Sequence, residues 1–133
     1  AVSSCLRTQP ATRNVSLGYF GASTGAAAAL RAAAHVNLDI DAVVSRGGRV
    51  DMASEVLSTL QSPCLFIVGG ADTQVLQLNR AAYARLSCAK KLYVVEGAGH
   101  LFEGAGELEE VAKVAASWFA DHLTDVSFKD RYD

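Results

Sequence analysis

The sequence predicts an α/β fold in which a parallel sheet of about four strands is flanked by helices. Four apolar runs are nearly continuous rather than alternating, which is typical of strands buried on both faces of a parallel sheet. Segments with helical periodicity separate these runs. The chain has 133 residues, of which 50% are hydrophobic and 20% charged, a composition that suits one core. We therefore expect residues 1–133 to form a single domain.

The first half of the chain supplies two strands and two helices. Residues 14–20 (NVSLGYF) form the first apolar run, and the alanine-rich residues 24–35 that follow favour a helix. Residues 41–45 (DAVVS) form the second run. Residues 51–60 are expected to be helical, with Asp51 as the N-cap.

The second half repeats the alternation. Residues 64–70 (CLFIVGG) form the third run, and the apolar positions of residues 74–87 fall on one face of a helix. Residues 91–97 (KLYVVEG) form the fourth run. Residues 107–122 are expected to form a helix because acidic residues occupy its first turn and apolar residues recur at helical spacing. The last ten residues are expected to be a loose tail.

Composition excludes several classes of function. The net charge is -2 and the basic residues are scattered, so neither a nucleic-acid footprint nor a membrane-binding patch is expected. Cys5, Cys64 and Cys88 are an odd number without metal-ligand spacing, so we expect three free thiols, no metal site and no cofactor. No apolar stretch reaches the ~18 residues of a membrane span and no signal peptide opens the chain, so a cytoplasmic location is expected.

Three chemically useful side chains follow three of the predicted strands. Ser23 stands in the G-x-S-x-G sequence Gly21-Ala22-Ser23-Thr24-Gly25, Asp72 follows the third run, and His100 follows the fourth. Functional residues gather at the carboxyl ends of parallel strands, so we expect these three at one edge of the sheet. The order Ser…Asp…His is the one found in α/β-hydrolases.

Each residue type suits one step of nucleophilic catalysis. Ser23, exposed on a tight turn, would attack a carbonyl carbon, and His100 would accept its proton and return it to the leaving group. Asp72 would hold the imidazole in the required tautomer. The backbone N–H of Thr24 would provide half of an oxyanion hole.

The glycines of the turn are expected to have a steric role. Gly21 and Gly25 would let the strand and the helix approach closely around the nucleophile elbow. The same glycine-rich turn could instead cradle a phosphate, but no lysine or distal glycine completes a P-loop.

Each of these residues also has a purely structural interpretation. Asp72 could simply cap helix 74–87, and His100 could be an ordinary loop histidine. His35 and His122 are interpreted as structural, because both lie near helix C-termini. Arg46 is interpreted as a solvated rim charge, with a substrate-carboxylate contact as the other possibility.

Four stretches together resemble the dienelactone-hydrolase-like branch of the α/β-hydrolase superfamily: GYFGASTGAAAAL, SRGGRVDMA, LFIVGGADTQVLQLNR and VVEGAGHLFEGAGELEEVAKVAASWF. They cover nearly all of residues 14–122. The resemblance implies that Ser23, Asp72 and His100 are the family triad. True dienelactone hydrolases carry cysteine at the nucleophile position, so serine here implies generic ester or acyl hydrolysis. The match is to the second half of the family fold, from the nucleophile strand onward.

Two functions follow from this comparison. The first is a serine hydrolase that cleaves small esters or acyl compounds. It would act weakly alone, with the Thr24 N–H as its one oxyanion donor, or fully with a partner chain that supplies the second donor. The second is a non-catalytic half-fold remnant that acts as an interaction or assembly module. Strand 14–20 has no neighbour on its outer side, so we expect a homodimer through this strand, with a complementary N-terminal half chain as the competing partner.

Overall fold

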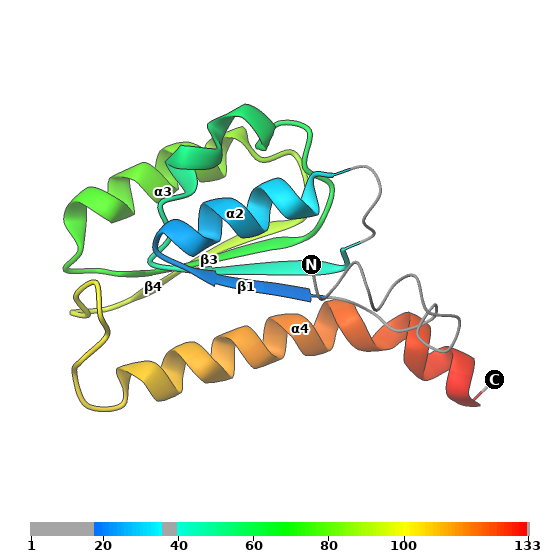
Figure 1. Cartoon of the computed structure of the whole chain (residues 1–133). Coiled ribbons are helices and arrows are strands. Elements are labelled where there is room, and N and C mark those ends of the chain that lie inside the picture. The colour runs from blue at the N-terminus through cyan, green and yellow to red at the C-terminus, as the bar shows by residue number, and fades with distance from the viewer. Residues whose placement is uncertain (1–17, 36–39, 133) are drawn as a thin grey trace.

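The fold is a four-stranded parallel sheet with helices on both faces, seen in a computed structural model (Figure 1). The structure describes residues 18–35 and 40–132, and the side chains only as far as Leu123. The strands are β1 (Gly18–Ala22), β2 (Ala42–Arg46), β3 (Cys64–Gly69) and β4 (Lys90–Val95), and they pair in the order β1-β2-β3-β4. All three pairings are parallel, which confirms the predicted fold class. Residues 14–17 of the predicted first strand lie outside the described residues.

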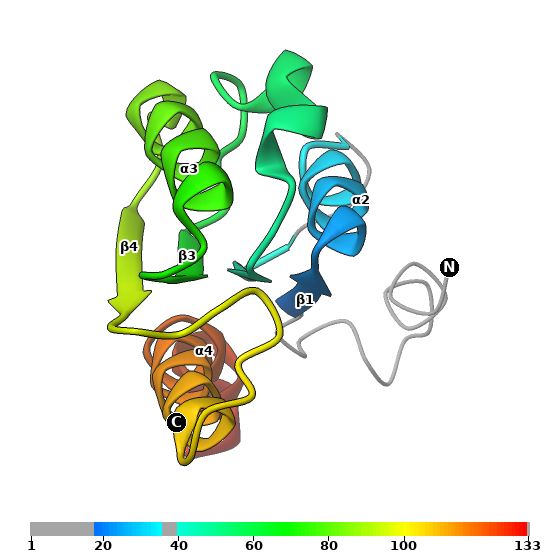
Figure 2. The same cartoon turned by 90° about the vertical axis from the view of Figure 1, so that its left-hand side faces the viewer.

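The helices form two layers. Helices α2 (Thr24–Ala33), η2 (Val50–Val56) and α3 (Thr73–Arg85) cover one face of the sheet, and α4 (Glu107–Tyr132) covers the other (Figure 2). The predicted loose tail is wrong, because the backbone of α4 continues to Tyr132. In the described part of the chain, no helix has the length and apolarity that a membrane-spanning helix needs.

The predicted helix over residues 51–60 is shorter and of another type. It is the 3₁₀ helix η2, which is interrupted by non-helical backbone angles at Ala53. Asp51 is not its N-cap; it lies in the first turn and accepts two hydrogen bonds of 3.0 Å from the Arg49 guanidinium. Leu57 and Leu60 are nevertheless buried. The segment therefore packs against the core, although its backbone is not a regular α-helix.

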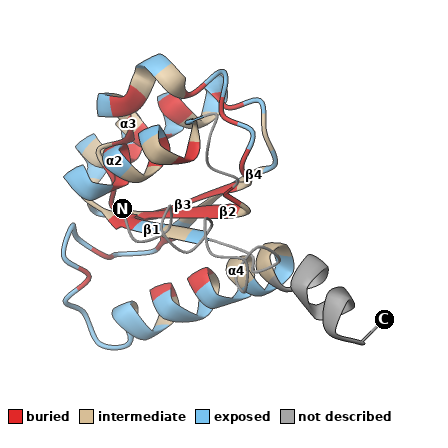
Figure 3. Ribbon diagram, turned by 45° about the vertical axis from the view of Figure 1, so that its right-hand side comes forward, coloured by how far each residue is buried: buried red, intermediate tan, exposed pale blue. Residues whose placement is uncertain are grey.

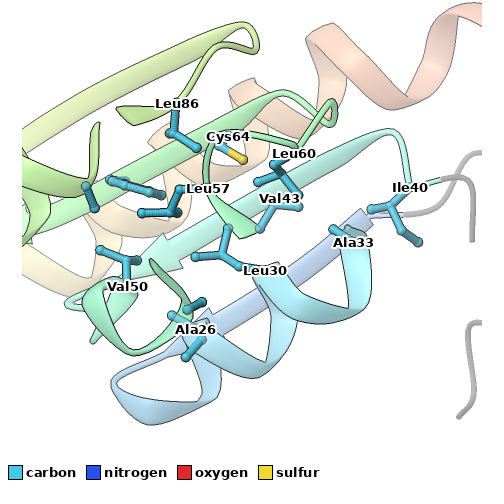
Figure 4. Packing of buried hydrophobic residues seen from close by; sticks show 14 residues of the cluster. Ala26, Leu30, Ala33, Ile40, Val43, Val50, Leu57, Leu60, Cys64 and Leu86 are labelled. Atoms are coloured by element: carbon cyan, nitrogen blue, oxygen red, sulfur yellow. The ribbon is translucent and has the colours of Figure 1, made fainter. Parts of the chain in front are cut away.

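Two hydrophobic clusters pack the helices against the sheet. The larger one lies between the sheet and helices α2, η2 and α3, and includes Leu30, Val43, Leu57 and Leu86 (Figure 4). The second lies between the sheet and α4, and burial follows the inward side of that helix (Figure 3). Strand β3 is buried along its whole length, which explains why its sequence is continuously apolar.

Two features bear on the expected assembly and on the cysteines. Among the described strands, β1 is at the edge of the sheet and pairs with β2 alone, and its Phe20 is 51% exposed. Cys64 and Cys88 are free thiols, as predicted, whereas Cys5 lies outside the described residues.

Candidate active site

Ser23 occupies a strained turn between β1 and α2. Its backbone angles are φ 52° and ψ -123°, a left-handed conformation that is uncommon for any residue other than glycine. The turn is held by the end of β2 and by the loop after it: Ser23 N–H donates to the Arg46 carbonyl at 3.2 Å, and Arg49 N–H donates to the Ser23 carbonyl at 2.9 Å. The Ser23 hydroxyl does not cap α2 by a hydrogen bond. The turn therefore positions a hydroxyl that is not used to stabilise the helix.

The two glycines that flank this turn differ in what they do. A Cβ on Gly21 would lie 2.7 Å from both the Ala26 Cα and the Gly25 carbonyl oxygen, so only glycine allows this close approach of strand and helix. A Cβ on Gly25 would meet nothing within 4 Å. The expected steric role is thus confirmed for Gly21 and wrong for Gly25, whose missing side chain faces open space.

Asp72 and His100 form a hydrogen-bonded pair. Asp72 Oδ2 lies 2.8 Å from His100 Nδ1. Asp72 occupies the N-cap position of α3, but its carboxylate makes no capping hydrogen bond, so the interpretation as a simple helix cap is wrong. In the neutral imidazole, this geometry has Nδ1–H donating to the carboxylate and Nε2 as the acceptor. The Asp72 side chain is 15% exposed and that of His100 40%, so the acid is sheltered and the imidazole is accessible.

The loops after β3 and β4 are bound to each other, and this fixes the pair. Ala71 N–H donates to the Ala98 carbonyl at 2.9 Å, and a Cβ on Gly69 would lie 2.2 Å from that carbonyl oxygen. Phe102 anchors the far end of the loop that carries His100, because it is fully buried against β2 and α4 residues. Backbone packing of the two strand ends therefore brings Asp72 and His100 together.

The loop after β2 lies between Ser23 and His100. Gly47 has φ +54°, and a Cβ built on it would lie 3.4 Å from both Cε1 and Nδ1 of the imidazole. Among the described side chains, no hydrogen bond joins the Ser23 hydroxyl to His100, so of the three predicted catalytic residues His100 and Asp72 are the two that are hydrogen-bonded to each other. Hydrogen bonds of this kind are often long in the absence of substrate.

Thr24 is the first residue of α2. Its backbone N–H therefore has no acceptor inside the helix, as for every residue in a first helical turn. The dipole of α2 adds partial positive charge at the same point. The geometry of the turn thus suits a developing negative charge beside Ser23.

The remaining predicted positions have separate places. The Arg46 guanidinium lies 5.8 Å above the centre of the Phe102 ring, on the α4 side of the sheet. His122 lies within α4, ten residues before its end at Tyr132, so its expected place near a helix C-terminus is wrong. Its ring is tilted by 52° against Trp118, with centroids 4.3 Å apart. His35 lines a hollow of about 750 Å³ where α2 ends and β2 and β3 begin, at the edge of the sheet opposite Ser23.

Sequence reasoning missed two positions near the site. Gly47 adopts a left-handed conformation against the imidazole, and Asn79 is a wholly buried polar residue in α3. The signal for Asn79 was present: it interrupts the apolar stripe of a predicted helix, where a polar side chain needs a hydrogen-bond partner.

The chain is similar to curated proteins and to solved structures. No protein-family model matches the chain. Two curated proteins of Mycobacterium tuberculosis, from strains CDC 1551 and H37Rv, carry the name "Putative phosphoribosyl transferase". Each is 54% identical over 122 residues, which is 92% of this chain and 28% of the relative. The transferase name therefore describes proteins of which this chain matches little more than a quarter.

Solved structures give the clearer match. Dienelactone hydrolase from Anabaena variabilis ATCC 29413 superposes with a TM-score of 0.87 at 45% identity, over 91% of this chain and 56% of that protein. Monoacylglycerol lipase from Paleococcus ferrophilus has a TM-score of 0.72 at 15% identity and covers 84% of this chain and 71% of its own. A predicted CIB-like hydrolase from Thermoplasma acidophilum has a TM-score of 0.69 at 18% identity. At these low identities the last two show the fold alone.

Proposed function

We propose that this chain, which is about half of an α/β-hydrolase fold of the dienelactone-hydrolase-like branch, is a serine hydrolase that cleaves small esters or acyl compounds. Ser23 is the proposed nucleophile, His100 the general base and Asp72 the residue that orients it. The observation that carries the proposal is the 2.8 Å hydrogen bond between Asp72 and His100 beside the strained Ser23 turn.

Acylation would use the proton positions set by this pair. The Ser23 Oγ attacks the carbonyl carbon of the ester while His100 Nε2 removes the hydroxyl proton. The Asp72 carboxylate stabilises the imidazolium that results. The carbonyl oxygen becomes an oxyanion, which the Thr24 N–H stabilises at the N-terminus of α2. The imidazolium then gives its proton to the departing alkoxide, and the acyl group stays on Ser23.

Deacylation repeats these steps with water. His100 Nε2 takes a proton from the water molecule, the resulting hydroxide attacks the acyl carbon, and the Ser23 oxygen leaves with the proton that His100 returns. One N–H alone stabilises the oxyanion less well than two, and removal of one such donor costs on the order of 10²–10³ in rate. We therefore expect slow turnover by the isolated chain.

A small substrate fits the surroundings of His100. The residues that follow it line an open hollow of about 440 Å³, among them Leu101 and Leu108, both exposed. Both leucines offer contact to the acyl chain of a small ester, and the same hollow is also lined by Glu103 and Glu109. This arrangement supports an apolar acyl group as the part of the substrate that is recognised.

Hydrolysis of p-nitrophenyl acetate tests the proposal. We expect slow release of p-nitrophenol by the wild-type chain and a fall to the buffer rate in Ser23→Ala. Ser54→Ala is the matched control, because this serine lies in η2 and has no role in the proposed mechanism, so its loss should leave the rate unchanged. Retention of the full rate in Ser23→Ala would exclude Ser23 as nucleophile. A wild-type chain no faster than buffer would favour the non-catalytic module instead.

The outer edge of β1 is the proposed assembly surface. We propose that two isolated chains pair along this strand into one continuous sheet, because β1 lies at the edge of the described sheet and its Phe20 is exposed. The remaining part of the α/β-hydrolase fold is the competing occupant, since the chain spans 56% of the dienelactone hydrolase. Light scattering of the isolated chain should give a dimer mass, and a monomer mass at micromolar concentration would refute the pairing.

A further inference from the structure

The loop after β2 touches both halves of the candidate site. On one side Arg49 N–H donates to the Ser23 carbonyl at 2.9 Å, and on the other side Gly47 lies against the His100 imidazole. Gly48 stands between these two contacts. The position of Gly48 therefore influences how far the nucleophile turn lies from the imidazole.

Gly48 is confined by α2 on one side and by α3 on the other. A Cβ built on Gly48 would lie 2.5 Å from the Ala26 Cβ and 2.0 Å from Ser45 Oγ, so the loop is pressed against the start of α2. From the other side, Asn79 Nδ2 donates to the Gly48 carbonyl at 2.9 Å. Among the described residues, this hydrogen bond from the Asn79 side chain joins α3 to the loop.

Burial of the Asn79 side-chain amide in α3 costs free energy of folding. Asn79 has 0% exposure and lies on the buried stripe of α3 with Leu76 and Ala82. Its Nδ2 also donates to the Val75 carbonyl at 2.9 Å, so two carbonyl acceptors fix the orientation of the amide. Its Oδ1 has no partner among the described residues, which leaves part of the desolvation cost of the amide uncompensated. A leucine here would avoid that cost but would lose the hydrogen bonds to the Gly48 and Val75 carbonyls.

The same helix carries the acid. Asp72 precedes α3 by one residue, and Asn79 follows Asp72 by seven positions, or two helical turns, so both lie on one side of the helix. Asp72 holds the imidazole at 2.8 Å, while Asn79 holds the loop against which that imidazole rests. Helix α3 is therefore attached to His100 directly and to Ser23 through the loop.

We infer that Asn79 is a positioning residue that fixes the Gly47–Arg49 loop and thereby sets the distance between the Ser23 turn and the Asp72–His100 pair. This inference rests on the proposed function for its effect on rate. The effect of Asn79 on the position of the loop does not depend on catalysis. A displacement of about 1 Å at such a site costs on the order of 10²-fold in rate.

The test compares Asn79→Leu with Leu78→Ala, a variant of the neighbouring half-buried residue of α3, whose side chain takes no part in the described hydrogen bonds to the loop. The first readout is amide hydrogen exchange of Arg49, measured against the core amides of β3 as an internal reference. The second is the rate at which a fluorophosphonate probe modifies the chain. In Asn79→Leu we expect Arg49 exchange to accelerate at least tenfold relative to β3, and labelling to slow about 10–100-fold. Asn79→Ala serves as a second variant if Asn79→Leu does not fold.

Each outcome decides the inference. Faster Arg49 exchange with slower labelling in Asn79→Leu, and neither in Leu78→Ala, supports it. Unchanged Arg49 exchange in a folded Asn79 variant overturns it, and so does faster exchange with labelling at the wild-type rate. If the wild-type chain is not labelled at all, the proposed hydrolase function fails, while Arg49 exchange still shows whether Asn79 holds the loop.

Discussion

Gly21 and Gly25 provide a matched pair of substitutions in the same turn. In Gly21→Ala the new methyl group would lie 2.7 Å from the Ala26 Cα, 2.7 Å from the Gly25 carbonyl oxygen and 2.8 Å from the Ala26 nitrogen. All three atoms belong to the backbone of the first turn of α2, so no side-chain rotation relieves the overlap. In Gly25→Ala the methyl group would meet nothing within 4 Å.

The expected free energies of unfolding differ in sign between the two variants. Overpacking that forces a backbone shift costs about 1–3 kcal/mol, so Gly21→Ala should be destabilised by at least that amount. Alanine is favoured over glycine inside a helix by about 1 kcal/mol, so Gly25→Ala should be slightly more stable than wild type. The difference between the variants is then about 2–4 kcal/mol.

Urea unfolding followed by circular dichroism measures this difference, with unchanged m-values as the check that both variants unfold in the same way. Gly21→Ala should also slow fluorophosphonate labelling, because a displaced first turn of α2 carries Ser23 with it. The reasoning fails if Gly21→Ala is as stable as wild type, or if Gly25→Ala loses as much stability as Gly21→Ala.

Three further predictions concern single side chains. Ser23→Gly should raise the free energy of unfolding by about 1–2 kcal/mol, measured by urea unfolding, because glycine relieves the left-handed strain at φ 52°; no gain would mean that the turn is not strained. Asp72→Asn should slow ester hydrolysis by on the order of 10³–10⁴, because an amide no longer enforces the imidazole tautomer, and an unchanged rate would exclude the proposed role. A hydrogen bond from the Cys64 thiol lowers the pKa of Cys88 to about 7, whereas that bond and burial raise the pKa of Cys64. The rate at which iodoacetamide modifies Cys88 should therefore rise through about pH 7, and this modification should be absent in Cys88→Ser. Cys64 should react only after denaturation. A rate profile with its midpoint near pH 9 would contradict the pairing of the two thiols.

The sheet could be predicted from the sequence because its signal is local. Residues 64–70 are apolar without interruption, and β3 is buried on both faces, so the pattern and its physical cause agree. The parallel order followed from the helical segments between the runs. The places of Ser23, Asp72 and His100 then followed, because the carboxyl ends of parallel strands share one edge.

Other features depend on contacts that no local pattern encodes. Gly21 and Gly25 look equivalent in the sequence, yet only Gly21 lies against the backbone of a neighbouring segment. The segment 51–60 has helical spacing of apolar residues, but the backbone breaks at Ala53. Asn79 reads as a break in an apolar stripe, and its partner, the Gly48 carbonyl, is 31 positions away in the chain.

The central claim is that the Ser23 hydroxyl is a nucleophile, and covalent modification tests it most directly. The chain is incubated with a fluorophosphonate probe, digested, and mapped by mass spectrometry. The account predicts one phosphonylated residue, Ser23, in the wild-type chain and no adduct in Ser23→Ala. An adduct on any other serine, or an unmodified Ser23 after exhaustive incubation, would contradict it.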